Sequence, residues 1–373
     1  ARPHPYLPNL LRRVGLLRAC ALALAFMVGM PLLVIALSWG EVNAEIWLHL
    51  AQTQLGRLLG NTLVLVLGVG VSVLLLGVPL AWFIATCEFP GRKWFDVALM
   101  LPLAVPAYVM AFVLVGLLDY AGPVQTLLRG WIGPSIAFSF RGTGAVVMVM
   151  SLVLYPYVYL LGRAAFLEQS PSLFAVSRSL GHSALSTFFR VVLPIARPAI
   201  AVGLSLVLME TLNDFGTVDF FAVQTLTRGL FDTWMNLGNL GGAAQIATTM
   251  LIFVVILVTL ERYSRRRQQQ YAARDNRDPI HRFTMSFPRQ MICVVVCAVP
   301  LIFGFIIPGA TLGYYAWEYF DVSWNPDFIQ NTFNSLFLSS AAALTTLIIG
   351  VTLAYSRRLH NTRGMQILMR LSS

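Results

Sequence analysis

The sequence predicts an all-α membrane protein with about eight transmembrane helices, and two observations support this prediction. Of its 373 residues, 57% are hydrophobic and only 11% are charged, whereas soluble domains are nearer a quarter charged. A helix needs about 20 mostly apolar residues to cross the hydrocarbon core of a bilayer. Eight such stretches occur along the chain: 16–39, 60–86, 95–118, 144–166, 197–218, 243–261, 291–315 and 333–355.

The distribution of charge predicts the orientation of these spans. If the N-terminus lies in the cytoplasm, the segments on that side hold 22 of the 26 basic residues. An excess of Lys and Arg in cytoplasmic loops is the rule for membrane proteins. The net charge of +10 therefore reflects topology. We expect a multi-pass protein of the inner (plasma) membrane that contacts lipid and binds no nucleic acid.

An internal repeat appears when the chain is compared with itself at an offset of 273 residues. Asn61-Thr62-Leu63 then pairs with Asn334-Ser335-Leu336, and Gly77 pairs with Gly350. The offset predicts two parallel copies of six spans each, of which the second is incomplete. We expect residues 1–373 alone to be inactive in transport. The predicted segments are an N-terminal helix with its outer loop (1–57), a first transmembrane domain (58–262), a basic linker (263–289) and the start of the second copy (290–373).

The cytoplasmic segment 163–196 predicts two short helices joined by a bend. Ser170-Pro171 is typical of a helix start, and Gly181 suits the left-handed position that ends a first helix over 171–180. Ser183 can cap a second helix, which we expect to end at Pro194. Its apolar side would hold Leu185, Phe188, Phe189 and Val192. The alternative is a plain connector whose arginines contact lipid headgroups.

The same segment resembles the cytoplasmic loop of type I ABC importer permeases. That family's pattern is Glu-Ala-Ala, three residues, Gly, nine residues, Ile, one residue, Leu-Pro. Gly181, Leu193 and Pro194 match it and Val191 replaces the Ile, but Ala175-Val176-Ser177 replaces Glu-Ala-Ala. The resemblance implies that the loop docks on an ATPase subunit and transmits its closure. The coupling residues would be Arg178, Ser179, Leu180, Gly181, Val191, Leu193 and Pro194.

Within that superfamily the chain is most similar to iron(III) permeases in which two such halves are fused. The similarity rests on segments 101–108, 210–218 and 225–230. It implies an importer that moves iron(III) into the cytoplasm by alternating access. The partners would be a pair of cytoplasmic ATPase subunits and a periplasmic or lipoprotein substrate-binding protein. Permeases for sulfate, thiamine, polyamines and phosphonates share parts of the pattern, so these substrates remain alternatives.

The chain holds no ATPase motif of its own. A phosphate-binding loop of the G-x-x-x-x-G-K-[ST] kind needs a lysine, and the single lysine, Lys93, is followed by Trp94. We therefore predict a transport subunit that is not an enzyme, with no cofactor and no resident metal. The alternatives are an ion-coupled secondary transporter, which would use Glu210 and Asp214, and a membrane scaffold.

Four polar residues near the end of the fifth span predict part of a translocation pathway. Glu210, Asn213, Asp214 and Thr217 recur at i, i+3, i+4 and i+7, which places them on one face of a helix. Ionisable groups at membrane depth are costly unless they face a cavity or a partner. The alternative is that Glu210 only pins one helix to another.

Prolines in the third span predict a gate, because proline interrupts helical hydrogen bonding. Pro102 and Pro106 would kink or unwind that span, and Pro156 could do the same in the fourth. The outward loops 120–143 and 316–331 are rich in aromatic residues. They would either receive the binding protein or anchor the chain at the membrane interface.

Overall fold

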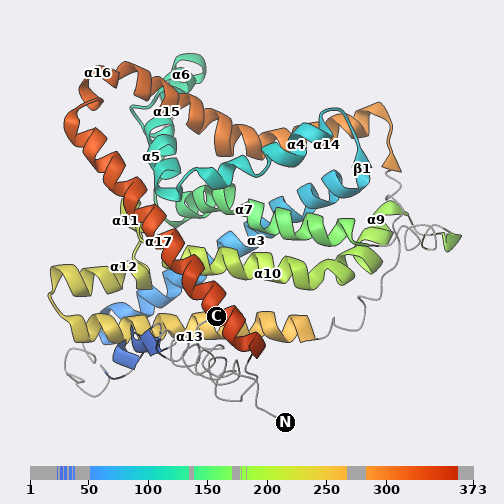
Figure 1. Ribbon diagram of the computed structural model, residues 1–373. Helices are drawn as coiled ribbons and strands as arrows, with labels where there is room; N and C mark the ends of the chain where they lie inside the picture. Colours follow the sequence, from blue (N-terminus) through green and yellow to red (C-terminus); the bar gives the residue numbers. More distant parts are fainter. Residues whose placement is uncertain are drawn as a thin grey trace, which may run out of the picture. The chain divides into compact units, whose positions relative to one another are not determined.

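The computed structural model describes residues 51–133, 138–169, 177, 179–181, 183–266 and 283–359, with scattered positions between 23 and 37. The first half contains η2 (Ala51–Leu55), α3 (Gly56–Thr86), β1 (Cys87–Glu88), α4 (Arg92–Ala98), η3 (Leu101–Ala104), α5 (Ala107–Leu118), α6 (Pro123–Ile132) and α7 (Thr143–Leu167) (Figure 1). Next come α9 (Ala184–Thr187), η4 (Phe188–Val192), α10 (Leu193–Asn213), α11 (Gly216–Phe220), α12 (Leu226–Phe231), η5 (Asp232–Asn236) and α13 (Leu240–Arg266). The last elements are β2 (Phe283–Thr284), α14 (Phe287–Leu301), η6 (Ile302–Ile306), α15 (Ile307–Glu318), α16 (Phe320–Ser323) and α17 (Pro326–Leu359).

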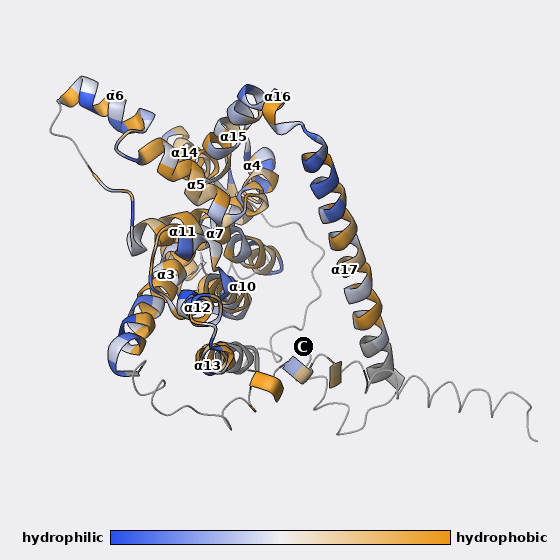
Figure 2. Cartoon of the chain, turned by 90° about the vertical axis from the view of Figure 1, so that its left-hand side faces the viewer, coloured by the Kyte–Doolittle hydropathy of each residue, from blue (hydrophilic) through white to orange (hydrophobic). Residues whose placement is uncertain are grey.

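Most of the predicted spans correspond to long apolar helices. Within the described residues, six helices are long and apolar enough to cross a membrane: Gln52–Thr86, Ala107–Ile132, Thr143–Leu167, Leu185–Asn213, Phe287–Glu318 and Pro326–Thr352. A shorter apolar helix covers Leu240–Ile256. Apolar residues predominate along the helices of the larger unit (Figure 2). The predicted span 16–39 lies mostly outside the described residues, so the count of eight stays a prediction.

Two predicted spans differ from a simple helix. The stretch 95–118 is α4, η3 and α5 in succession, with the interruption that Pro102 and Pro106 predict. The predicted end of the fifth span is wrong, because the helix ends at Asn213 instead of continuing to residue 218. Pro156, by contrast, lies inside the unbroken helix α7. Proline is tolerated within transmembrane helices where neighbouring groups satisfy the freed backbone.

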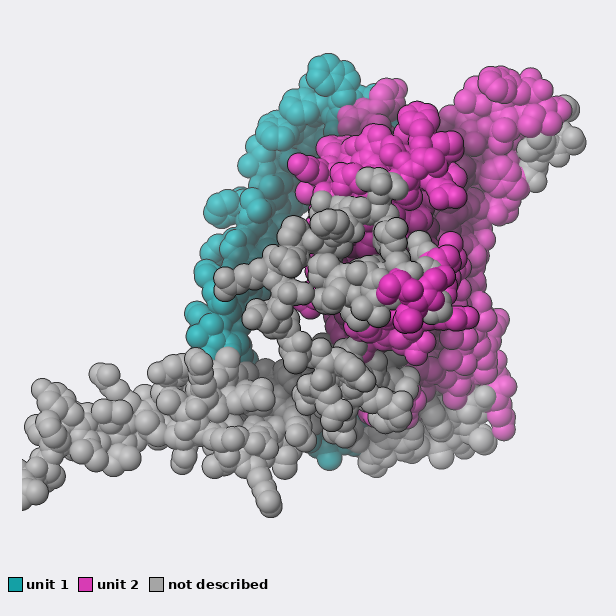
Figure 3. Space-filling view, turned by 90° about the vertical axis from the view of Figure 1, so that its right-hand side faces the viewer, with its two compact units in different colours: residues 1–42, 315–373 teal, residues 43–314 magenta. Residues whose placement is uncertain are grey.

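The chain divides into two compact units, residues 43–314 and residues 1–42 with 315–373, which Figure 3 shows in different colours. In the larger unit, α7 packs against both α3 and α10. Glycines permit this close approach, as expected in lipid, where small residues let helix backbones meet. A Cβ added to Gly77 would lie 2.9 Å from Val158, and one added to Gly203 would lie 2.9 Å from the Tyr157 carbonyl oxygen.

The larger unit gathers the predicted cytoplasmic loops at one end of its helices. β1 and β2 pair in parallel, with Cys87 opposite Phe283, so the loops after the second and sixth predicted spans meet. The end of the bundle that carries β1 also carries α9, and α11 and α12 lie at the opposite end (Figure 1). This sorting agrees with the alternation of sides that the sequence predicts.

The helix that the repeat assigns to the second copy begins within the larger unit. α14 contacts α3 and α4, and η6 contacts η3 and α7. Cys293 and Cys297, which share one face of α14, are buried in the core together with Leu301. The predicted segment boundaries themselves stay a prediction.

Candidate functional site: a cytoplasmic knob, a broken span and a polar outer end

The described part of the loop 163–196 forms a bend with a capped helix behind it. Gly181 has a φ of +80°, so the predicted left-handed position is confirmed. Ser183 caps the following helix, because its Oγ accepts a hydrogen bond from the Ser186 N–H at 3.3 Å. Ser170, Pro171 and Arg178 lie outside the described residues.

We call the described part of the loop 163–196 the knob. Two hydrogen bonds connect residues within it. The Gln169 side chain donates to the Val192 carbonyl oxygen at 3.0 Å, which joins the entry of the loop to its exit. The buried hydroxyls of Ser177 and Thr187 lie 2.7 Å apart and share a second hydrogen bond. Both bonds are buried, and they join described residues of the loop that are 23 and 10 positions apart in the sequence.

The four apolar residues predicted on one side of the second helix are not equally buried. Val192 is fully buried and Phe188 is partly buried, but Leu185 is 71% exposed and Phe189 is 57% exposed. Leu180, beside Gly181, is 71% exposed as well. The loop therefore carries an outer apolar surface of Leu180, Leu185 and Phe189, while its inner side faces the bundle.

The inner side is attached through three aromatic rings. The Phe188 ring lies 4.9 Å from that of Trp82 in α3, measured between centroids. The Phe166 ring, near the end of α7, lies 5.7 Å from Trp82 and 6.2 Å from Phe188. Aromatic pairs at such distances add packing energy beyond the burial of area.

Pro194 does not end the second helix, contrary to prediction. α9, η4 and α10 follow one another without interruption, and Pro194 lies in the first turn of α10. A proline is accepted near a helix start. Directly before it, η4 is a π-helix, and its wider turn shifts the hydrogen-bond register. The partly buried residues Val191, Leu193 and Pro194 thus connect the knob rigidly to the fifth span.

The predicted polar stripe at the end of the fifth span is only half realised. Glu210 and Asn213 lie in the last turn of α10 and are exposed. Asp214 has left the helix, and its carboxylate accepts hydrogen bonds from the Thr217 N–H and hydroxyl at 2.7 and 2.9 Å. Asp214 therefore fixes the start of α11, and buried Thr217 does not continue the face of α10.

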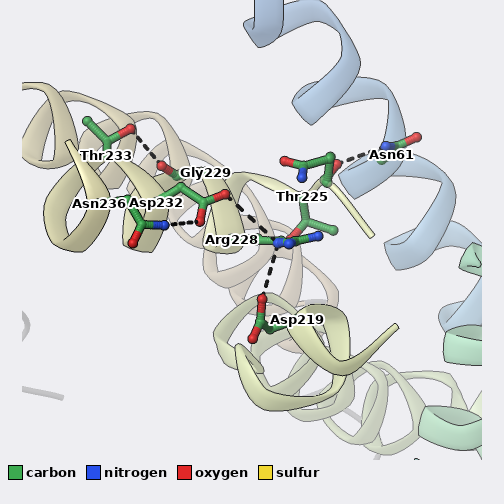
Figure 4. A network of polar contacts seen from close by, with 9 residues as sticks. Asn61, Asp219, Thr225, Arg228, Gly229, Asp232, Thr233 and Asn236 are labelled. Atoms are coloured by element: carbon green, nitrogen blue, oxygen red, sulfur yellow. Dashed lines mark hydrogen bonds and ion pairs between the residues drawn. The ribbon is translucent and has the colours of Figure 1, made fainter. Parts of the chain in front are cut away.

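Sequence reasoning missed a polar network beside this stripe (Figure 4). The Arg228 Nε lies 3.2 Å from Asp219 Oδ1 and 3.9 Å from Asp232 Oδ2, so one guanidinium links α11, α12 and η5. In the sequence, the segment 225–230 contributes only to the family resemblance. Spacing alone does not show that three loop elements converge on its arginine.

The first copy of the repeat motif, Asn61-Thr62, contacts the same outer loop. The Asn61 side chain donates to the Gln224 carbonyl oxygen at 2.8 Å. The Thr62 hydroxyl accepts from the Leu226 N–H at 2.9 Å. Both residues of α3 therefore anchor the outer loop that carries Arg228.

The third span breaks where the two prolines predict. Pro102 lies in η3 and is buried, whereas Pro106 is the exposed N-cap of α5. The Met100 N–H turns to the Val97 carbonyl and the Leu103 N–H to the Met100 carbonyl, each at 3.1 Å. The carbonyls of Asp96 and Leu99, which a continuous α-helix would pair with those two amides, need other donors.

The described residues thus form a bundle of long apolar helices with a broken third span and a loop that leads directly into the fifth. Residues 77–270 match the family of binding-protein-dependent transport system inner membrane components, and the chain belongs to that family. Its fold is similar to that of a bacterial alginate ABC transporter, solved with an alginate pentasaccharide-bound periplasmic protein. The TM-score is 0.54 at 20% identity, over 71% of this chain and 99% of that one. The predicted permease fold is confirmed.

Two curated relatives are permease proteins of different transport systems. The chain is 26% identical over 344 residues to the Fe(3+)-transport system permease protein FbpB 2 of Haemophilus influenzae, covering 89% of this chain and 64% of that protein. It is 28% identical over 204 residues to the molybdenum transport system permease protein ModB of Escherichia coli, covering 53% of this chain and 88% of ModB. The chain thus spans less than two thirds of the iron permease.

Proposed function

We propose that this chain is the membrane-spanning part of an ATP-driven importer whose energy enters through the 163–196 knob. The observation that carries the proposal is the division of that loop into two sides. Leu180, Leu185 and Phe189 expose apolar surface around the left-handed Gly181. Large apolar side chains exposed on a bend outside the membrane favour a protein interface.

The partner of this surface would be a cytoplasmic ATPase subunit, one of a pair. The other components would be a substrate-binding protein outside the membrane and a second set of permease helices. The N-terminus would then lie in the cytoplasm. The exposed apolar residues Leu127, Trp131 and Ile132 of α6 lie in the loop 120–143, where the binding protein would dock.

The knob is tested by replacing Gly181 with leucine in the full-length permease, reconstituted with its ATPase and binding protein. Open space surrounds Gly181, so the substitution acts through the backbone. A side chain at positive φ costs about 1–2 kcal/mol, which lowers the population of the bent loop about tenfold, and we expect ATP-driven uptake to fall with that population. Gly144→Leu is the matched control, because Gly144 also faces open space, has no positive φ and lies in the first turn of α7, outside both proposed docking loops. Equal uptake by the two variants would contradict the proposal.

The substrate we propose is iron(III). The similarity to the iron permease over 89% of this chain supports this proposal. Glu210 and Asp214 add carboxylates near the outer end of the fifth span, and such hard oxygen groups suit a hard cation.

The substrate is tested by measuring uptake of radioactive ferric iron and radioactive molybdate into the same proteoliposomes. We expect iron uptake that falls in Glu210→Gln, because this substitution removes the exposed charge and keeps the shape. Molybdate uptake without iron uptake would assign the chain to the other group of relatives.

A further inference from the structure

Two tyrosines of α7 supply the donors that the broken third span lacks. The Tyr155 hydroxyl donates to the Leu99 carbonyl oxygen at 3.0 Å. The Tyr159 hydroxyl donates to the Asp96 carbonyl oxygen at 3.0 Å and also lies 3.1 Å from Asp96 Oδ1. These are the two carbonyls whose usual amide partners have turned elsewhere.

Both tyrosines are fully buried, so the two carbonyls depend on their hydroxyls for a hydrogen-bond donor. A carbonyl left without a donor away from water costs about as much as a lost hydrogen bond. Water cannot easily replace the hydroxyls in such a site. The break therefore depends on the position of α7 along its axis, and on its rotation about that axis, relative to α4.

The same face of α7 continues toward the cytoplasmic knob. Residues 155, 159 and 163 are four apart, so their side chains follow one side of the helix. Arg163 pairs with the Asp96 carboxylate, its Nη2 donating to Oδ2 at 2.6 Å. Phe166, less than one turn further, reaches Trp82 and Phe188 of the knob. One helix face thus connects the loop to the break.

We propose that Tyr155 and Tyr159 are positioning residues that form a latch on the broken third span, through which movement of the knob reaches the gate. The inference deepens the proposed function and rests on it for its transport role. A shift of α7 along its axis would withdraw both hydroxyls together. The span near Pro102 and Pro106 would then be released to change its shape.

The chain offers a matched set of variants for the test. Tyr155→Phe and Tyr159→Phe remove one oxygen each and keep the ring that packs. Tyr157→Phe is the control, because Tyr157 lies between them on α7 and its hydroxyl makes no hydrogen bond within the described part of the chain. All three are compared in the full-length permease.

The first measurement is hydrogen–deuterium exchange of the amides of residues 97–105, which needs no partner subunit. We expect exchange to rise about threefold to tenfold in Tyr155→Phe and Tyr159→Phe, the effect of one hydrogen bond, and to stay unchanged in Tyr157→Phe. Unchanged exchange in both test variants would overturn the latch, whatever the transport assay shows.

The second measurement is substrate uptake per ATP hydrolysed in proteoliposomes that contain the ATPase and the binding protein. We expect this ratio to fall at least about threefold in the two test variants and to match the wild type in Tyr157→Phe. Raised exchange with an unchanged ratio would overturn the transport role. If the wild type itself shows no ATP-driven uptake, the proposed function fails, and the exchange measurement still decides whether the latch exists.

Discussion

The third and fifth spans both contain two prolines, yet only the third is broken. Pro102 and Pro106 separate α4, η3 and α5, whereas Pro194 and Pro198 lie within a helix that continues to Asn213. The third span has external donors for its freed carbonyls, the hydroxyls of Tyr155 and Tyr159. The comparison teaches that proline permits a break in a membrane helix, while donors on a neighbouring helix stabilise it.

The largest effect is expected where the continuous fifth span meets α7. Gly203→Val would push a side chain against the Tyr157 carbonyl oxygen and the Val158 Cα. Overpacking of this kind costs about 1–3 kcal/mol or more. We expect a clear fall in the thermal unfolding temperature of the purified protein in detergent.

Gly144→Val is the control, because Gly144 lies in the first turn of α7 and faces open space. If both variants unfold at the same temperature, packing on α7 does not keep the fifth span continuous, and the comparison of the two spans fails.

A smaller effect is expected at the ion pair beside the break. Asp96→Asn weakens the contacts of Arg163 and Tyr159, whose partner carboxylate is only 19% exposed. We expect a loss of about 1–3 kcal/mol of unfolding free energy. The exposed pair of Asp119 with Arg141 should contribute less than about 1 kcal/mol.

Denaturant unfolding of Asp96→Asn and Asp119→Asn in the same detergent checks this difference. A loss for Asp119→Asn as large as that for Asp96→Asn would mean that burial does not set the strength of these pairs. A double-mutant cycle with Arg163→Gln then isolates the coupling of Asp96 to α7.

The smallest effect is expected for Pro198→Ala. The helix already runs through this position, so the regained backbone donor is offset by the greater freedom of the unfolded chain. The change in unfolding free energy should stay within about 1 kcal/mol. A larger change in thermal stability would show that Pro198 strains the fifth span. The two spans would then respond to proline in a similar way.

The sequence predicted individual features of the candidate site better than their arrangement. Gly181, the Ser183 cap and the break near Pro102 are local, because backbone conformation and missing amides follow from residue type. The division of Leu185 and Phe189 from Phe188 and Val192 was not predictable, since all four are apolar and only their neighbours decide which are covered.

The tyrosines show the same limit. Tyr155 and Tyr159 occur in an apolar stretch with a third tyrosine between them, and nothing local distinguishes the three. The role of Arg228 likewise follows only from the contacts that it makes between α11, α12 and η5. Contacts between residues 56 to 67 positions apart, such as those of Tyr155, Tyr159 and Arg163, leave no periodic signal.

The sequence by itself determined the membrane class and the family, and it predicts the alternation of sides. These depend on composition, on the placement of charge relative to apolar stretches, and on a spaced motif, all of which are properties of a linear chain. Only the tertiary structure decided which donors satisfy the carbonyls of the broken third span, and that the knob has an outer and an inner side. Hydrogen-bond donors and covering side chains for these features come from other helices, and their positions depend on how the whole bundle packs.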